Sequence, residues 1–310
     1  MEKKILLAVD DSVHSKNAVR YAVRMSSVVK DLSYTLLNVQ PGISQFLVDE
    51  AKTNLKAQSA LERLKKKNAA ASQAMLENCK AQLVEMGIDD KRVDVKTLRQ
   101  KRGLGKNILE HAEERLYDAI VVGRRGLSRI QEMFMGGLTS SLVECSKVIP
   151  LWIVDGEVKS SKIMLTTDGS ESSLRTVDHV SFMLMGNPDV QITLFHVLPR
   201  IGDFCKVDFG DTSGDDVEDI IIKGDKRCVE SFLSHAHRKF NESGFQKDQI
   251  KIKEVKAISN VGKAIMEEAE TGNYGTVIVG RRGISKSFFM GSVSKYVLDR
   301  TSDRALWLVP

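Results

Sequence analysis

The chain has 310 residues, of which 42% are hydrophobic and 28% are charged, and its formal net charge is +5. Such a length fits two domains of about 100–150 residues each. No apolar run approaches the ~20 residues that cross a bilayer, and the apolar run at residues 5–9 is too short for an export signal. The modest positive charge permits anion binding without demanding a nucleic-acid partner. We therefore expect a cytoplasmic protein that engages neither membrane nor nucleic acid.

The first half alternates strand and helix patterns. In chain order we expect strands at residues 3–10, 33–40, 92–98, 119–123 and 148–154, with helices at 13–29, 44–86, 104–117 and 137–146 between them. The basic run at residues 63–67 belongs to the long second helix, and we interpret it as a solvated helix face because no aromatic residues interrupt it.

The second half repeats this order. We expect strands at residues 162–168, 190–197, 250–258, 276–280 and 305–309, and helices at 172–185, 224–241, 261–270 and 292–299. The acidic stretch at residues 203–219 is expected to be a surface loop. Near-continuous apolar strands that alternate with helices indicate a parallel sheet covered on both faces. The predicted fold class is therefore α/β, with two tandem five-stranded parallel-sheet domains.

An internal repeat supports this division. The segment GRRG occurs at residues 123–126 and again at 280–283, each time directly after a short β-branched run. Two further pairs recur at nearly the same spacing, namely Asp10 with Asp168 and Val39 with Val197. A period this long indicates duplicated globular domains rather than a solenoid. We place the first domain at residues 1–157 and the second at 158–310.

The repeated residues follow the carboxyl ends of three strands, where open α/β sheets form their ligand crevice. An Asp at the first corner (Asp10, Asp168) can accept hydrogen bonds from ribose, and a Val at the second (Val39, Val197) can line an adenine pocket. Glycines at the third corner let backbone N–H groups approach phosphates. A helix N-cap is the alternative role for each Asp.

The spacing of the glycines is the most specific signal. Gly123 and Gly126 are followed by nine residues and then by Gly136. Here the chain resembles the universal stress proteins, whose nucleotide-binding signature is Gly-x-x-Gly, nine residues, then Gly-Ser/Thr after the fourth strand. The resemblance covers essentially the whole chain as a tandem pair. It implies a flavodoxin-like, adenine-nucleotide-α-hydrolase-like fold and a stress-response protein that binds ATP or AMP, with or without Mg²⁺.

Each half departs from the signature in its own way. Gly137 stands where the first half should carry Ser or Thr, which removes one hydroxyl from the phosphate site. The second half keeps Gly291 and Ser292, with Ser292 expected to cap the last helix, but only seven residues separate Gly291 from Gly283. The complete chemical groups favour the second half and the shorter loop argues against it, so the sequence leaves open which half binds.

The two central positions of each GRRG segment are arginines, a residue type suited to bidentate phosphate contacts, although solvent exposure or pairing with acids is an equal alternative. The resemblance and these arguments together predict the following nucleotide-binding residues: Asp168, Val197, Gly280, Arg281, Gly283, Gly291, Ser292, Asp10, Val39, Gly123, Arg124, Gly126 and Gly136.

No catalytic or metal site is predicted. The chain has no G-x-S-x-G elbow and no Walker lysine, so we expect no enzyme, with slow ATP hydrolysis left open by the resemblance. His235 and His237 do not share a helix face, which argues against a metal site. The four cysteines have no C-x-x-C spacing and indicate neither disulfides nor zinc: Cys79, Cys145, Cys205 and Cys228.

Two other functions remain as alternatives. Both sites could have degenerated, which would leave a tandem that acts as a protein-interaction module with an unknown protein partner. An ATP-activating synthase of the α-hydrolase group ranks last, because the segments after the first strands lack paired glycines. The closing strands of the two halves, at residues 148–154 and 305–309, are expected to pair within the chain in the way that family members dimerise, and a further homodimer is compatible with this.

Overall fold

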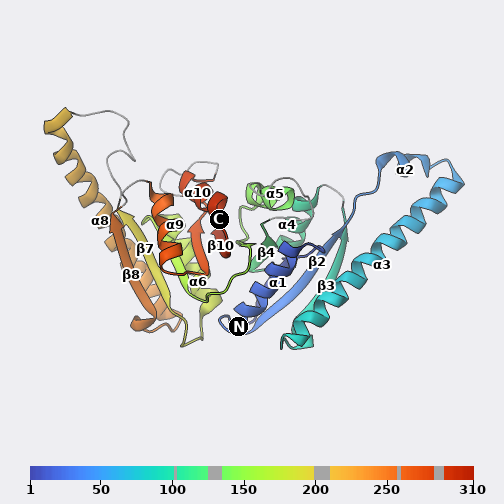
Figure 1. Cartoon of the computed structure of the whole chain (residues 1–310), viewed down its shortest axis with the longest axis horizontal. Coiled ribbons are helices and arrows are strands. Elements are labelled where there is room, and N and C mark those ends of the chain that lie inside the picture. Colours follow the sequence, from blue (N-terminus) through green and yellow to red (C-terminus); the bar gives the residue numbers. More distant parts are fainter. Residues whose placement is uncertain (101–102, 125–134, 199–209, 257–259, 283–289) are drawn as a thin grey trace. The chain divides into compact units, whose positions relative to one another are not determined.

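The computed structural model describes residues 1–100, 103–124, 135–198, 210–256, 260–282 and 290–310 (Figure 1). The chain divides into two compact units, Met1–Ser26 with Asp31–Ile149 and Ser27–Lys30 with Pro150–Pro310. The first unit thus ends just before the strand that closes the first sequence repeat. The domain boundary between residues 157 and 158 stays a prediction.

The first unit is an α/β sandwich. Its elements in chain order are β1 (Lys3–Ala8), α1 (Val13–Met25), β2 (Leu32–Gln40), α2 (Gln45–Glu50), α3 (Leu55–Glu85), η1 (Asp90–Arg92), β3 (Val93–Arg99), α4 (Leu104–Glu114), β4 (Ala119–Gly123) and α5 (Gly137–Cys145). The strands are parallel in the order β3-β2-β1-β4. Residues Ile5, Leu6 and Leu7 of β1 are all buried, as expected for a central strand covered on both faces.

This strand order determines where a ligand can bind. The chain moves outward from β1 to β2 and β3, then returns to the other side of β1 to form β4. The two crossovers that leave from neighbouring strands β1 and β4 therefore diverge, and a crevice opens between their carboxyl ends. Asp10 follows β1 and Gly123 ends β4, so both predicted residues border this switch point.

The second unit repeats the arrangement and adds a strand. Its elements are β5 (Leu151–Asp155), β6 (Ile163–Thr167), α6 (Glu171–Leu184), β7 (Ile192–Leu198), α8 (Gly210–Glu242), η2 (Lys247–Gln249), β8 (Ile250–Lys256), α9 (Val261–Thr271), β9 (Thr276–Gly280), α10 (Ser292–Arg300) and β10 (Arg304–Val309). The strand order is β5-β10-β9-β6-β7-β8. Strand β5 runs antiparallel to β10, so the expected pairing of the two closing strands is observed. The predicted α/β class is confirmed.

Two predicted elements were wrong in detail. The single helix expected at residues 44–86 is two helices, because Asn54 begins α3 as an N-cap whose side chain accepts hydrogen bonds from the N–H groups of Lys56 and Ala57. The acidic stretch expected to be a loop up to residue 219 is helical from Gly210 onward. Acidic residues favour the first turns of a helix, where they complement its dipole, so this composition is compatible with a helix start.

Candidate functional site

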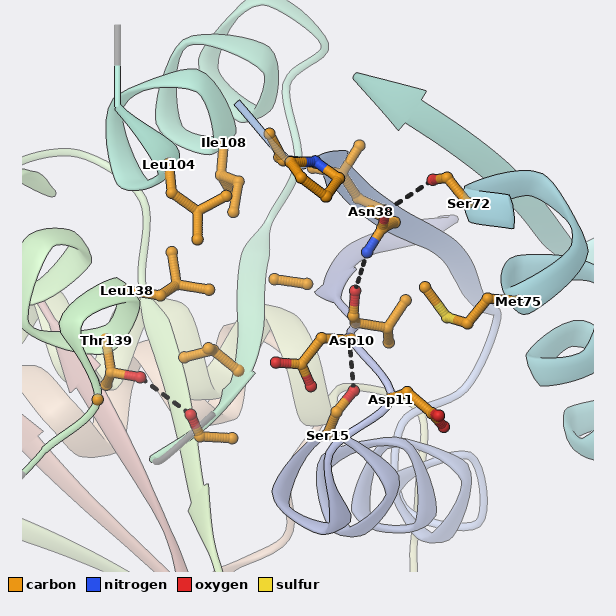
Figure 2. Close-up of a pocket in the computed structure, with 18 of the residues that line it drawn as sticks. Asp10, Asp11, Ser15, Asn38, Ser72, Met75, Leu104, Ile108, Leu138 and Thr139 are labelled. Atoms are coloured by element: carbon orange, nitrogen blue, oxygen red, sulfur yellow. Dashed lines mark hydrogen bonds between the residues drawn. The ribbon is translucent and has the colours of Figure 1, made fainter. Parts of the chain in front are cut away.

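A cavity of about 510 Å³ opens at the carboxyl end of the sheet in the first unit. Its lining comes from the ends of β1, β2 and β4, the starts of α1, α4 and α5, and one face of α3. Figure 2 shows Leu138 and Thr139 on one side, Ser72 and Met75 on the opposite side, and Asp10 between them. The volume lies in the range of about 300–1,000 Å³ that small-molecule sites occupy. The cavity therefore joins all three corners that the sequence analysis selected, through Asp10, Val39, Gly123 and Gly136.

The first corner is built by a short hydrogen-bonded turn. The Asp10 carboxylate accepts a hydrogen bond from the Ser12 N–H at 3.0 Å, and the Asp10 N–H donates to the Ser15 hydroxyl at 3.1 Å. The N-cap of α1 is Ser12, whose hydroxyl accepts from the Ser15 N–H. Because Asp10 is not the cap and its carboxylate points into the cavity (Figure 2), it keeps acceptor capacity for a ligand hydroxyl.

The second corner connects three elements through side chains. The Asn38 amide donates to the Val9 carbonyl oxygen at 2.8 Å, and the Ser72 hydroxyl donates to Asn38 Oδ1 at 2.6 Å (Figure 2). These bonds tie α3 to the end of β2, next to Val39. This wall was not predicted from the sequence, although a Ser among the apolar buried residues Leu61, Leu76 and Leu83 of α3 is a signal that could have indicated a polar partner.

The third corner is the start of α5. The Gly136 N–H donates to the Arg124 carbonyl oxygen at 2.9 Å, and the Thr139 hydroxyl donates to the Gly123 carbonyl oxygen at 2.9 Å. Gly136 is the N-cap of α5 and no side chain caps the helix. The first N–H groups of a helix point outward with the positive end of the helix dipole, and Gly136, Gly137, Leu138 and Thr139 all line the cavity. This corner suits an anion.

The second unit closes its glycine segment in the same way. The Gly291 N–H donates to the Arg281 carbonyl oxygen at 2.9 Å, and the Ser294 hydroxyl donates to the Gly280 carbonyl oxygen at 2.6 Å. The difference of two residues in loop length therefore falls between the same pair of anchoring bonds in each unit. The prediction that Ser292 caps α10 was wrong, because the N-cap is Gly291 and Ser292 is the first helical residue.

The arginines of the GRRG segments were predicted to contact phosphate, with solvent exposure or pairing with acids as an equal alternative; for Arg124 and Arg281 the structure excludes solvent exposure. Arg124 and Arg281 are each only 5% exposed, and Arg124 is not among the residues that line the cavity. Their backbone carbonyl groups anchor the returning loop. Arg125, Gly126 and Gly283 lie outside the described residues, so the predictions for Gly126 and Gly283 stay predictions.

Gly123 has a packing role as well. A Cβ atom at this position would lie 2.7 Å from the backbone carbon and oxygen of His14, at the start of α1. At Gly280 the nearest atom would be the Ser172 hydroxyl oxygen, at 2.8 Å. The first glycine of each GRRG segment therefore permits a helix to pack closely against the end of the fourth strand, whether or not a ligand is bound.

The second unit carries the corresponding corner residues. Asp168 Oδ1 accepts hydrogen bonds from the Ser170 N–H at 3.0 Å and from the Ser173 hydroxyl at 2.7 Å. Val197 lies at the end of β7 and is 6% exposed. Asp168 thus has an additional hydroxyl donor within its own turn, compared with the hydrogen bonds described for Asp10.

Helix α8 covers the first corner of the second unit closely. Met75, which lines the cavity on α3, is separated by 157 positions from Phe232 on α8, the same spacing as the GRRG segments. Phe232 is only 2% exposed. A Cβ atom at Gly169, next to Asp168, would lie 3.3 Å from the backbone of Cys228 on α8. Phe232 is thus a larger, buried side chain at the position that corresponds to Met75 by this spacing, and the backbone of α8 lies close to the turn after β6.

A smaller cavity of about 330 Å³ lies between α1 and α3 and shares Asp10, Asp11, Ser15 and Met75 with the larger one. Cys79 lines it, and burial raises the pKa of its thiol to about 11. The thiol therefore stays protonated at neutral pH and is not an activated nucleophile.

Two further features, a metal-binding cluster and a membrane-spanning helix, are absent from the described residues. No group of three or more His, Cys, Asp or Glu side chains within them could hold a metal ion. In the same part of the chain, none of the helices combines the length and the apolar character that crossing a bilayer requires.

Comparison with known proteins identifies the family. The model of the universal stress protein family matches the chain twice, at residues 1–155 and 159–303. The chain belongs to this family. A curated relative, universal stress protein YxiE of Bacillus subtilis (strain 168), is 26% identical over 156 residues, which is 50% of this chain and 99% of the relative.

Two solved structures have the same fold over nearly the whole chain. A universal stress protein from Archaeoglobus fulgidus DSM 4304 matches 99% of this chain and 97% of its own, with a TM-score of 0.65 and 18% identity. A protein from Pseudomonas aeruginosa PAO1 matches 99% of this chain and 92% of its own, with a TM-score of 0.57 and 13% identity. At these identities the likeness concerns the fold.

Proposed function

We propose that the first unit binds an adenine nucleotide, ATP or AMP, and that the protein uses this binding in a stress response rather than in catalysis. The observation that carries the proposal is the continuous cavity that joins Asp10, Val39, Gly123 and the start of α5. Each wall matches one part of a nucleotide: an uncapped helix start for phosphate, a carboxylate for ribose hydroxyls, and apolar side chains for the base.

The first unit is the better candidate, although the intact Gly291–Ser292 pair had favoured the second. In the first unit the half-buried Met75 borders the cavity, whereas Phe232, which corresponds to it by sequence spacing in the second unit, is buried. Asp10 also faces the cavity, while Asp168 accepts an additional hydroxyl hydrogen bond from Ser173. The missing hydroxyl at Gly137 is compensated in part by backbone N–H groups, which supply most of the anion site at a helix start.

A matched pair of variants tests this assignment. Isothermal titration of ATP and of AMP would be done with the parent protein and with Asp10→Ala and Asp168→Ala. Loss of a charge-assisted hydrogen bond costs about 1.5–3 kcal/mol, so Asp10→Ala should weaken binding by roughly 10- to 150-fold. Asp168→Ala should leave affinity unchanged. Weakening by Asp168→Ala alone would move the site to the second unit, and no binding by the parent would reject the proposal in favour of an interaction module.

A further inference from the structure

Helix α3 carries a polar residue, Asn68, that lines the cavity without a hydrogen-bond partner among the described residues. Asn68, Ser72 and Met75 all line the cavity, and their spacing of four and three residues places them on one face of the helix. Asn68 is half-buried, and its amide makes no hydrogen bond to any other residue that the structure describes. A side-chain amide carries two donors and an acceptor, so this residue faces the cavity with its hydrogen-bonding capacity unused.

The neighbouring polar side chains, Ser72 and Asn38, are by contrast hydrogen-bonded within the protein. The Ser72 hydroxyl donates to Asn38 Oδ1 at 2.6 Å, and the Asn38 amide donates to the Val9 carbonyl oxygen. These bonds occupy Ser72 and Asn38 and fix the position of α3 one helical turn beyond Asn68. Asn68 is therefore held at the cavity by a rigid support while its own amide remains available.

The orientation of the proposed nucleotide places its base near this helix. The anion corner at the start of α5 lies on one side of the cavity, Asp10 lies in the middle, and α3 lies on the opposite side (Figure 2). Phosphate, ribose and base follow one another in a nucleotide, so the base reaches the wall formed by Val39 and α3. We infer that Asn68 reads the edge of the base and makes the site specific for adenine. This inference rests on the proposed nucleotide binding in the first unit.

The chemistry of the amide supports adenine over 6-oxopurines. An Asn side chain can accept from the adenine N6 amino group and donate to N7 at the same time. Hypoxanthine and guanine present acceptors at both O6 and N7, so the amide oxygen has no donor to meet. A good bidentate pair discriminates by about 1–3 kcal/mol, which corresponds to roughly 5- to 150-fold in dissociation constant.

Inosine triphosphate is the sharpest probe, because it replaces the 6-amino group of ATP by oxygen and keeps the ribose and phosphates. Dissociation constants for ATP and ITP would be measured by calorimetry for the parent, for Asn68→Ala, and for Gln73→Ala as a control on the same helix. Gln73 is exposed and its amide bonds to Glu77. Alanine favours helix, and a thermal melt of each variant checks that both remain folded.

We expect the parent to bind ATP more tightly than ITP by roughly 5- to 150-fold, and Asn68→Ala to lower this ratio at least 5-fold. Gln73→Ala should keep the parent ratio. A ratio unchanged in Asn68→Ala, or a parent that binds ATP and ITP equally, would overturn the role of Asn68 while nucleotide binding stands. A parent that binds neither nucleotide would instead reject the proposed function itself.

Discussion

The two equivalent glycines Gly123 and Gly280 give an internal comparison of packing, because an added methyl group meets different atoms at each. At Gly123 it would lie 2.7 Å from the backbone carbon and oxygen of His14. Carbon atoms in favourable contact are about 3.5–4.0 Å apart, so the first turn of α1 must move by roughly 1 Å. Overpacking of this kind typically costs about 1–3 kcal/mol, and we expect Gly123→Ala to lower the free energy of unfolding by that amount.

At Gly280 the nearest atom is the Ser172 hydroxyl oxygen at 2.8 Å, the end of a side chain that can rotate. This hydroxyl is buried and has no hydrogen-bond partner among the described residues, so its rotation breaks no bond. The next backbone contact is the Arg282 carbonyl oxygen at 3.3 Å, which requires a shift of only a few tenths of an ångström. Gly280→Ala should therefore cost less than about 1 kcal/mol.

Urea unfolding followed by far-UV circular dichroism measures both variants. Tryptophan fluorescence adds a separate signal from the second unit, because Trp152 and Trp307, the two tryptophans of the chain, both lie there. Since Asp10 precedes α1, a displaced helix start should also weaken ATP binding in Gly123→Ala. Equal losses of stability in the two variants, or a larger loss in Gly280→Ala, would refute the packing argument.

Three further results are expected. Burial lowers the pKa of His179 to about 3, so below about pH 6.5 the unfolded chain binds a proton that the folded chain does not. The free energy of unfolding should therefore fall by up to about 1.4 kcal/mol per pH unit from pH 6.5 toward 3. Urea unfolding of His179→Gln should show a flatter pH profile, and an unchanged profile would show that His179 is not the cause. Cys79 is half-buried and its thiol pKa is raised to about 11, whereas Cys228 is exposed. Cys79 should therefore react with iodoacetamide at pH 8 much more slowly than Cys228, as measured by peptide mass spectrometry. Equal rates of reaction would contradict the protection of Cys79. Met75→Phe should abolish nucleotide binding while the protein stays folded, because it introduces the larger side chain that the second unit carries at Phe232. If calorimetry shows an affinity equal to that of the parent, this side chain does not decide which unit binds.

The fold was largely predictable from the sequence. Nearly continuous apolar strands such as residues 119–123 and 276–280 need burial on both faces, which only a parallel sheet under two helical layers provides. The repeat of Asp10 and of the glycine segment at corresponding places then located both switch points. What the pattern could not show was the break at Asn54, because the two hydrogen bonds that its side chain accepts override an otherwise uninterrupted helical composition.

The sequence by itself determined which corners could hold a nucleotide, since residues that follow parallel strands meet at one edge of the sheet whatever the helices do. Only the tertiary structure decided how open each corner is. Met75 and Phe232 are both apolar residues on a long helix, and nothing in their local sequence distinguishes cavity wall from core. Their surroundings differ: Met75 is half-buried beside the cavity of the first unit, whereas Phe232 is buried on α8, whose backbone lies close to Gly169 in the second. Contacts between segments far apart in the chain set these surroundings, and a one-dimensional pattern does not contain them.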